Sequence, residues 1–506
     1  MPGWIRSPLT TEQARSDITT ALRTRSARFL DLAYRAIYRR PRSPYLALLR
    51  HAGCELGDLQ RSVTRDGLEA TLHLLAAQGV YVRDDEWKGR SPIVRGSLRI
   101  HAPPSAFDNP FSRGHEVAYT GGSRGRSTRV LRSLDQHADI ARMELLIRHA
   151  HGIEGYATGI WATNPIPQAL YTVKLGAPLA LWAYPAAPLP PAARLAAGFL
   201  HAQMSRAGRR LPRPLHLDAR EPLRMLHELQ ARATRSGPIQ LFATPSLAVR
   251  VAAAAAEVGE RLEHVAFAAR SEPLTEGRRR DIEASGARVI GLYGSMELTY
   301  VSAGCAAPGS ADDSHLWTSY YAAITRPRRV FDDGPEVSAL LLTGLSHAAP
   351  KIGLNVDLGD CADITERGSE CCALGGLGLT THLSDIRGYE KLTGEGVTVA
   401  RTSIIGVIER TLPQRFGGSS IDYQIAEEIG TDGLTRTVLR AHPRLGALDD
   451  PLLRDALLGA IAQGDVADRH MARLWQHLES VVVRREPPLA SASGKVLPFH
   501  FGRATG

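Results

Sequence analysis

A short segment rich in glycine and hydroxyl groups, Thr120-Gly-Gly-Ser-Arg-Gly-Arg-Ser-Thr128, has the composition of an anion-binding loop. Its three glycines let the backbone approach a ligand closely, and its four hydroxyls and two guanidiniums can donate to anionic oxygens. A strand-like run, Glu116–Tyr119, precedes the loop, and we expect a helix after it, over residues 136–149. This order is the context of a phosphate cradle. The spacing is not G-x-x-x-x-G-K-S/T, which excludes an ordinary P-loop.

The same loop also fits a second motif. Gly121-Gly-Ser-Arg-Gly125 matches G-x-S-x-G, the nucleophile turn of many hydrolases, with Ser123 as the nucleophile. No spacing selects one of the downstream histidines, His315, His347 or His382, as its partner. A chain with 47 glycines produces such a match easily by chance, so phosphate binding is the preferred interpretation.

Three later segments each place an ionisable side chain on a turn or loop. Gly291-Leu-Tyr-Gly-Ser-Met-Glu297 is predicted to be a turn at a strand end that exposes one carboxylate, and Leu358-Gly-Asp360 offers another. Ser491-Ala-Ser-Gly-Lys495 presents a lysine on a loop of small residues. Of the 61 Lys and Arg residues only five are lysines, so a lysine at residue 495 is unusual in this chain and makes that position a candidate for a specific role.

In order and spacing, these segments and the Thr120–Thr128 loop resemble the core motifs of adenylate-forming enzymes, the acyl-CoA synthetase superfamily, and in particular its phenylacetate–CoA ligase branch. Ser43–Gly53 is similar to the N-terminal segment of that branch, and Ala269-Arg-Ser-Glu-Pro273 to its G-A-E-P turn. The resemblance implies an AMP-forming ligase that activates an aromatic or other acyl carboxylic acid with ATP and transfers it to coenzyme A. Transfer to an amine, a hydroxyl or a carrier protein is the alternative, and a catalytically degenerate nucleotide-binding module is the alternative of another class.

The resemblance also implies roles for single residues. Lys495 and Glu297 would be catalytic: the lysine would bridge the substrate carboxylate and the α-phosphate, and Glu297 would bind Mg²⁺. Asp360 would accept both ribose hydroxyls, and Tyr293 would stack near the adenine. The other residues that it assigns to the nucleotide are Thr120, Gly121, Gly122, Ser123, Gly125, Arg126, Thr128, Glu272, Pro273, Gly294, Ser295 and Arg387.

Several positions depart from the pattern of the family. Arg126 and Ser127 stand where lysine and proline are usual, and Met296 replaces a threonine. The hinge between the domains is irregular: one alignment places Asp385 at its arginine and another places Arg387 there. The sequence leaves that choice open.

Cysteines and nearby histidines suggest a second kind of site, because four of the five cysteines lie between residues 305 and 372. Some members of the branch carry a structural zinc bound by Cys, His and a C-x-C pair, and the corresponding residues here are Cys305, His315, Cys371 and Cys372. Thiolates and an imidazole suit a closed tetrahedral Zn²⁺ site, although the adjacent Cys371-Cys372 departs from C-x-C. Buried free thiols are the alternative.

The elements that must position these residues alternate along the chain. Between residues 115 and 383, short apolar runs alternate with helical stretches, which indicates an α/β fold after a largely helical first hundred residues. Glycine and polar residues cluster at residues 375–396, a credible domain boundary. We therefore expect a large N-terminal α/β adenylation domain, residues 1–386, and a small mobile C-terminal α+β lid, residues 387–506, that carries the lysine.

Composition sets the remaining expectations. The net charge of +9 is spread over 506 residues and is a weak argument for nucleic acid, so we expect none as a partner. No apolar stretch suits a signal peptide or a membrane span, which favours a cytoplasmic protein. Related ligases are commonly dimers, so a homodimer is a further expectation by resemblance.

Overall fold

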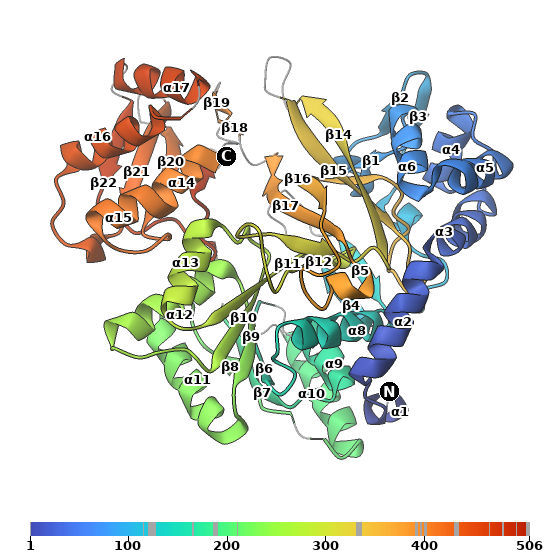
Figure 1. Ribbon diagram of the computed structural model, residues 1–506, viewed down its shortest axis with the longest axis horizontal. Helices are drawn as coiled ribbons and strands as arrows, with labels where there is room; N and C mark the ends of the chain where they lie inside the picture. The colour runs from blue at the N-terminus through green and yellow to red at the C-terminus, as the bar shows by residue number, and fades with distance from the viewer. Residues whose placement is uncertain are drawn as a thin grey trace.

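The structure, a computed structural model, describes residues 2–114, 116–119, 128–163, 166–185, 191–209, 211–329, 336–389, 393–394, 397–398, 402–429, 435–464, 466–477, 480–491 and 493–501. The N-terminal part is helical, as predicted, and packs beside the strands β14 and β15 (Figure 1). Its main helices are α1 (Pro2–Arg6), α2 (Thr11–Arg23), α3 (Arg25–Ala33), α4 (Pro44–His51), α5 (Leu56–Asp66) and α6 (Leu68–Ala77).

A mixed sheet of 13 strands forms the centre of the molecule. Its parallel part contains β6 (Ala157–Trp161), β7 (Leu179–Tyr184), β8 (Leu215–His216), β9 (Ile239–Ala243), β10 (Val265–Arg270) and β11 (Arg288–Ser295). Its antiparallel part adds β12 (Thr299–Gly304), β13 (Ser314–Leu316), β14 (Tyr321–Arg329), β15 (Glu336–Gly344), β16 (Val356–Glu366) and β17 (Thr381–Gly388). The short strand β1 (Val82–Arg83) pairs with β16.

Both faces of the parallel part are buried, because alternate residues of each strand enter two different cores. In β9, Leu241 packs in one cluster and Phe242 in the other. The face that carries Phe242 is covered by α8 (Leu134–Ala150), α9 (Ile166–Leu175) and α10 (Pro191–Arg206). The face that carries Leu241 is covered by α11 (Pro222–Ser236), α12 (Pro245–Glu257) and α13 (Glu276–Ala284) (Figure 1). Continuous apolar strands of this kind are typical of parallel sheets between helix layers.

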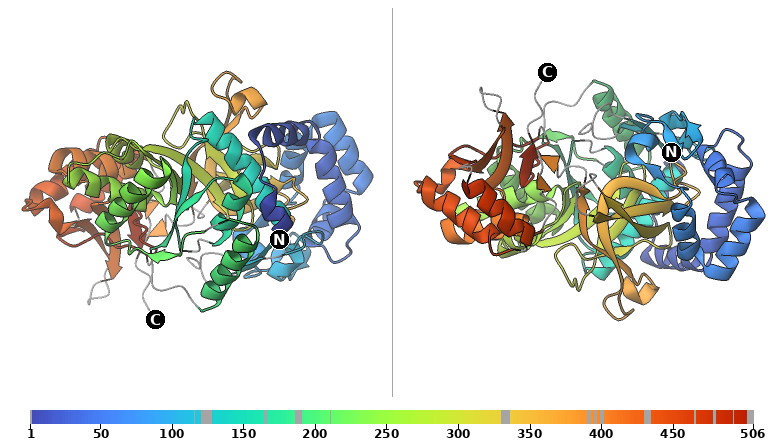
Figure 2. Two further views of the ribbon diagram at one scale, coloured as in Figure 1. Left: turned by 90° about the horizontal axis from the view of Figure 1, so that it is seen from below. Right: turned by 90° about the horizontal axis from the view of Figure 1, so that it is seen from above.

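The C-terminal part has a sheet and a core of its own. β22 (Val481–Arg484), β21 (Thr435–Ala441), β20 (Tyr423–Ile429) and β23 (Phe499–Phe501) form a four-stranded sheet. It packs with α14 (Thr402–Gly406), the π-helical segment η5 (Val407–Thr411), α15 (Leu412–Phe416), α16 (Asp450–Ile461) and α17 (Val466–His477), and forms a separate lobe in Figure 2. The predicted fold class, a large α/β part followed by a smaller α+β part, is confirmed. The predicted boundary at residues 386 and 387 falls within β17 and stays a prediction.

The structure corrects the context expected for the glycine-rich loop. β4 (Glu116–Tyr119) pairs in antiparallel register with β5 (Arg129–Arg132), and α8 begins only after β5. The loop therefore joins two strands instead of a strand and a helix, because Val130 is buried opposite Ala118 and continues the sheet pattern. Residues 120–127 lie outside the described part of the chain.

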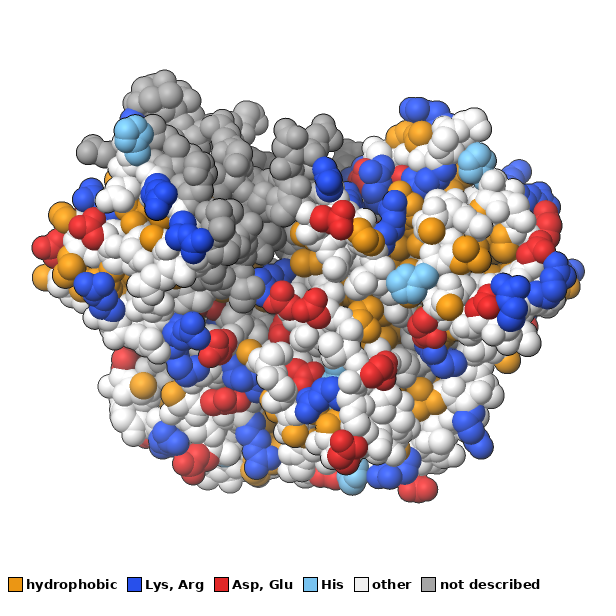
Figure 3. Space-filling model, turned by 45° about the horizontal axis from the view of Figure 1, so that its top comes forward, with side chains coloured by type: hydrophobic (Ala, Val, Ile, Leu, Met, Phe, Trp, Pro, Cys, Tyr) orange, Lys and Arg blue, Asp and Glu red, His pale blue; other side chains and the backbone are white. Residues whose placement is uncertain are grey.

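The surface charge on the face seen in Figure 3 does not indicate a particular partner. On the face that Figure 3 presents, Lys and Arg side chains are interspersed with Asp and Glu. Among the described residues, no helix combines the length and the apolar character needed to cross a membrane.

Candidate active site

Two cavities meet at the carboxyl ends of the central strands. The first, of about 330 Å³, and the second, of about 210 Å³, share four lining residues: Ser271, Leu292, Tyr293 and Gly294. All four lie at or just beyond the ends of β10 and β11, a pair of parallel strands. Side chains at the carboxyl ends of such strands converge on one crevice, which is the usual ligand site of open α/β sheets.

The first cavity brings together most of the predicted nucleotide-binding residues that the structure describes. It is lined by Glu272, Pro273, Tyr293, Gly294, Asp360 and Arg387. The Tyr293 hydroxyl donates to Oδ2 of Asp360 at 2.9 Å. Burial, together with the charge of Asp360, raises the pKa of Tyr293 well above its usual value, so the phenol keeps its proton and stays a donor.

Arg387 and Asp385, the two candidates for the hinge arginine, differ in placement. Arg387 lines the first cavity and forms an ion pair with Asp385, and burial lowers the pKa of its guanidinium. Asp385 is not among the lining residues and adopts a positive φ of 53°. Asp312 also lines this cavity and accepts from the backbone of Ile386 at 2.9 Å. No sequence motif marked Asp312.

Lys495 lies in the second cavity, at the wall that the two cavities share. Its Nζ donates to the carbonyl of Ser271 at 3.0 Å. The turn that carries it is closed by hydrogen bonds between Ser491 and the residues that follow, including the amide of Lys495 to the Ser491 hydroxyl at 3.2 Å. Gly494 has a φ of +80°, and a Cβ there would lie 2.7 Å from the Cβ of Ala219, so glycine is required.

A buried charge cluster holds the Lys495 turn against the first cavity. Arg278 of α13 is 1% exposed and lies between two carboxylates: its Nη1 is 2.6 Å from Oε2 of Glu272, and its Nε is 3.1 Å from Oε1 of Glu409. Its Nη2 also donates to the carbonyl of Val496, the residue after Lys495. Sequence reasoning missed Arg278, because the run of three arginines at residues 278–280 has the composition of a solvated helix face.

The turn at Glu297 corrects one expectation. Glu297 is 3% exposed, whereas the sequence predicts an exposed carboxylate. The turn folds inward because the Ser295 hydroxyl accepts from the amide of Leu298, which is itself buried. Among the described residues, Oε1 of Glu297 has no hydrogen-bond partner. A buried carboxylate oxygen without a partner fits a cation such as Mg²⁺, which prefers oxygen ligands.

The predicted phosphate loop contributes one described residue. Thr128 is half-buried at the start of β5. Thr120, Gly121, Gly122, Ser123, Gly125 and Arg126 lie outside the described residues. The histidines considered for a serine hydrolase all have other partners: His347 pairs with Asp31, His382 with Asp313, and His315 with Cys372.

The four predicted zinc ligands come together beside the first cavity. The ligand atoms of Cys305, His315, Cys371 and Cys372 all lie within 4.8 Å of one another. Nδ1 of His315 bonds the carbonyl of Leu379 at 2.6 Å, which turns Nε2 toward the thiols, 3.0 Å from Sγ of Cys372. Hydrogen bonds from Cys305 and His315 lower the pKa of Cys372, which favours its thiolate. Three thiols and one imidazole fit a closed tetrahedral zinc site.

No family model matches the chain, and no curated protein matches it significantly. Several solved structures are similar to it. A 2-hydroxyisobutyryl-CoA ligase, solved with 2-HIB-AMP and CoA, is 16% identical with a TM-score of 0.45, over 99% of this chain and 92% of that one. An anthranilate CoA ligase, solved with anthranoyl-AMP, is 12% identical with a TM-score of 0.46, over 81% and 69% of the two chains. The amide bond synthetase McbA from Marinactinospora thermotolerans is 13% identical with a TM-score of 0.42, over 94% and 98%. Two of these three structures are thus described as CoA ligases and the third as an amide bond synthetase.

Proposed function

We propose that this protein is an ATP-dependent ligase that activates a carboxylic acid as an acyl-adenylate. The observation that carries the proposal is the position of Lys495, a cation at the wall between two cavities. From there an ammonium group can reach the carboxylate of an acid in the second cavity and the α-phosphate of a nucleotide in the first. A compact charge on a flexible stem suits that bridging role.

The first cavity offers the groups that an adenosine needs. The Asp360 carboxylate can accept from both ribose hydroxyls, and Tyr293 fixes its orientation by donating to one of its oxygens. Pro273 and Leu292 supply apolar wall for the base. Glu272 is held in place by Arg278, so the turn that resembles G-A-E-P is rigid at this point.

The proposed first step is a displacement at phosphorus. A carboxylate oxygen of the acid attacks the α-phosphorus of ATP, the bond from that phosphorus to the bridging oxygen breaks, and pyrophosphate leaves with the electron pair. Lys495 would stabilise the negative charge on the oxygens of the α-phosphate as the bonds change. Glu297 would supply a carboxylate ligand to Mg²⁺, which neutralises phosphate charge when bound.

Coenzyme A is the acceptor that we propose for the second step. Its thiolate would attack the acyl carbon and AMP would leave, which yields a thioester. An amine, a hydroxyl or a carrier protein would react by the same displacement, and the irregular hinge sequence keeps these acceptors as the second candidate. In this proposal residues 387–506 are the lid, and they move Lys495 away before the acceptor enters.

The Cys305, His315, Cys371 and Cys372 cluster would hold a structural zinc. Ser314, the residue before His315, lines the first cavity, and so does Asp312. A metal there would stiffen the wall behind the nucleotide and would take no part in the reaction.

Pyrophosphate release tests the proposed function. The full-length protein is incubated with ATP, Mg²⁺ and a panel of aryl, fatty and dicarboxylic acids, with and without CoA. Release that depends on one class of acid supports adenylation, and consumption of CoA in proportion to release identifies the acceptor. Release without CoA consumption favours an amine, hydroxyl or carrier protein. The absence of both release and ATP binding would overturn the proposal and favour a degenerate module.

A further inference from the structure

The second cavity carries more positive charge than one carboxylate needs. The charged side chains among its described lining residues are Arg132, Arg270 and Lys495, and none of these lining residues is Asp or Glu. The predicted role of Lys495 accounts for one of the three cations. The two guanidiniums are not used by the reaction as proposed above.

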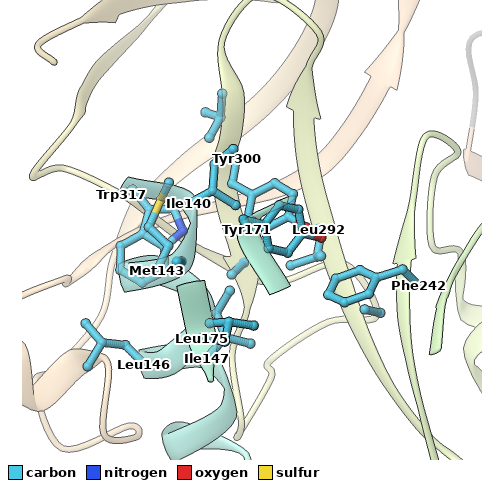
Figure 4. Close-up of a cluster of buried hydrophobic side chains, with 14 of the residues drawn as sticks. Ile140, Met143, Leu146, Ile147, Tyr171, Leu175, Phe242, Leu292, Tyr300 and Trp317 are labelled. Carbon is cyan, nitrogen blue, oxygen red and sulfur yellow. Dashed lines mark hydrogen bonds between the residues drawn. The ribbon is translucent and has the colours of Figure 1, made fainter. Parts of the chain in front are cut away.

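Arg270 is part of the inner wall of this cavity. It ends β10, and its register partner in β11 is Leu292, which both cavities share. Its guanidinium lies 5.8 Å from the centre of the Phe242 ring and hydrogen-bonds the hydroxyl of Tyr300, which is itself 2.9 Å from the hydroxyl of Tyr171. Figure 4 shows these aromatic rings gathered beside Leu292.

Arg132 completes the cationic lining from the other side. It is 7% exposed, and burial lowers the pKa of its guanidinium. One of its nitrogens donates to the carbonyl of Met296 at 3.1 Å, whereas its Nε has no hydrogen-bond partner among the described residues. A buried donor without a partner is costly unless a ligand satisfies it.

The carboxylates that interact with these guanidiniums lie outside the lining of the second cavity. Glu144 interacts with Arg270, but its Oε1 is already paired with Arg148 at 3.2 Å, and burial raises its pKa, so its anion is disfavoured. Glu116 and Glu297 interact with Arg132 from outside the cavity, and Glu116 is also paired with His137. Among the described residues, the charged groups that line the second cavity, where a substrate would lie, are therefore all cations.

We propose that the acid activated here is a compact dicarboxylic acid, whose second carboxylate binds Arg270 with support from Arg132. This inference rests on the proposed function and names its substrate class. A guanidinium presents a planar pair of donors that matches a carboxylate, so Arg270 selects for that group as well as attracting its charge. The aromatic rings pack against the carbon skeleton between the two carboxylates.

The size of the second cavity and the sequence around Arg270 both agree with a compact acid as the substrate. The cavity of about 210 Å³ is smaller than the ~300–1,000 Å³ of typical small-molecule sites. Lys495 donates to the carbonyl of Ser271, the residue next to Arg270, so the two cationic side chains meet the same part of the wall. In the G-A-E-P turn that this segment resembles, the position of Arg270 is a glycine, so this chain adds a charged side chain there.

Matched pairs of acids test the proposal. Rates of pyrophosphate release are measured with succinate against butyrate, glutarate against valerate, and phthalate against benzoate. We expect the diacid of at least one pair to have the higher kcat/KM, and Arg270→Gln to lower that kcat/KM about 10- to 100-fold while changing the value for the monoacid little. Arg288→Gln, at the opposite end of β11 and outside both cavities, is the matched control and should change neither.

The outcomes separate this proposal from the function on which it rests. Pyrophosphate release with monoacids only, or equal losses for both acids of a pair in Arg270→Gln, would overturn the diacid and leave adenylation standing. A raised KM for ATP in Arg270→Gln with every acid would assign the guanidinium to phosphate instead. No release with any acid would overturn the proposed function itself. If Arg270→Gln fails to fold, calorimetric binding of each acid to the unaltered protein with a non-hydrolysable ATP analogue decides, and tighter binding of the monoacids overturns the proposal.

Discussion

Arg278 of α13 and Glu409 of η5, 131 residues apart in the chain, form an ion pair in which each side chain is 1% exposed. The pair joins the second helix layer of the large sheet to the C-terminal lobe. The Arg278 guanidinium also pairs with Glu272, which lines the first cavity, and donates to the carbonyl of Val496, the residue after Lys495. The candidate site is therefore assembled from both parts of the chain.

Removing one partner of this pair should destabilise the protein strongly. Glu409→Ala leaves a buried guanidinium short of one anion, and we expect it to lower the free energy of unfolding by about 3 kcal/mol. Arg410→Ala is the control, because it breaks an exposed pair with Glu276 between the same two segments and should cost less than about 1 kcal/mol. Urea denaturation of the two variants measures the difference, and equal losses would show that burial of the pair is unimportant.

Stability should also depend on pH through Glu409. Burial raises the pKa of this carboxyl, and a second buried carboxylate, Glu272, shares its guanidinium. A group whose pKa is raised in the folded state stabilises that state at low pH, and this contribution is lost as the pH rises through the raised pKa. Glu409→Gln keeps the neutral shape at every pH. The free energy of unfolding of the wild type should therefore fall relative to that of Glu409→Gln as the pH rises, and parallel curves would contradict the shift.

Lys495→Ala should abolish adenylation and spare nucleotide binding. Its ammonium group donates to the Ser271 carbonyl, and the side chain lines the second cavity, not the first. Loss of one charge that acts on the reacting phosphate should lower kcat for pyrophosphate release by about 10²- to 10³-fold. Calorimetric binding of ATP should change little. A variant with near-normal release would show that another group stabilises the charge.

The ribose assignment of Asp360 can be tested with a modified nucleotide. Asp360→Asn keeps the shape and removes the charge that would accept both hydroxyls, so KM for ATP should rise about 10-fold or more. With 2′-deoxy-ATP the same substitution should cost less, because one of the two contacts is already missing. Tyr293→Phe, which loses the 2.9 Å bond to Asp360, should show a smaller effect in the same direction. Equal effects with both nucleotides would contradict contact with the 2′-hydroxyl.

Metal analysis tests the thiol–imidazole cluster. We expect about one zinc per chain in the native protein, since four suitable ligands meet there. Cys372→Ser should lose the metal and lower the melting temperature. Cys54→Ser is the control, because Cys54 is buried near Tyr38 in the N-terminal helices, outside the cluster. Native protein without zinc, or equal effects of the two substitutions, would favour free buried thiols.

Much of the fold follows from periodicity. The predicted helix over residues 136–149 lies within α8, and β9, β10 and β11 are among the short apolar runs predicted to alternate with helices between residues 115 and 383. These elements are predictable because buried parallel strands and amphipathic helices differ in length and pattern. The sequence did not predict the pairing of β4 with β5. The four residues of β5, Arg129–Arg132, have an arginine at each end and therefore give a weak apolar signal.

The site was less predictable than the fold. The resemblance selected Tyr293, Asp360 and Lys495 from motif spacing, and in the structure these residues line two adjoining cavities. Their roles stay predictions. Motif spacing gave no sign that Arg278 and Arg132 are buried or that Arg270 lines the second cavity, because in a chain with so many arginines the residue type alone does not distinguish a solvated side chain from a buried one. Burial of Glu297 likewise depends on tertiary packing that a turn motif does not encode.

The carbonyl of Val496 accepts from Arg278 and from the hydroxyl of Ser246, and its amide donates to the same hydroxyl at 3.0 Å. The residue next to Lys495 is thus fastened at three points to the part of the chain that forms the cavities. The lid movement proposed above would break all three of these bonds, which only two side chains, those of Arg278 and Ser246, make. The contacts of Val496 would then have two states, formed and broken, and the ammonium group of Lys495 would leave the second cavity when they break.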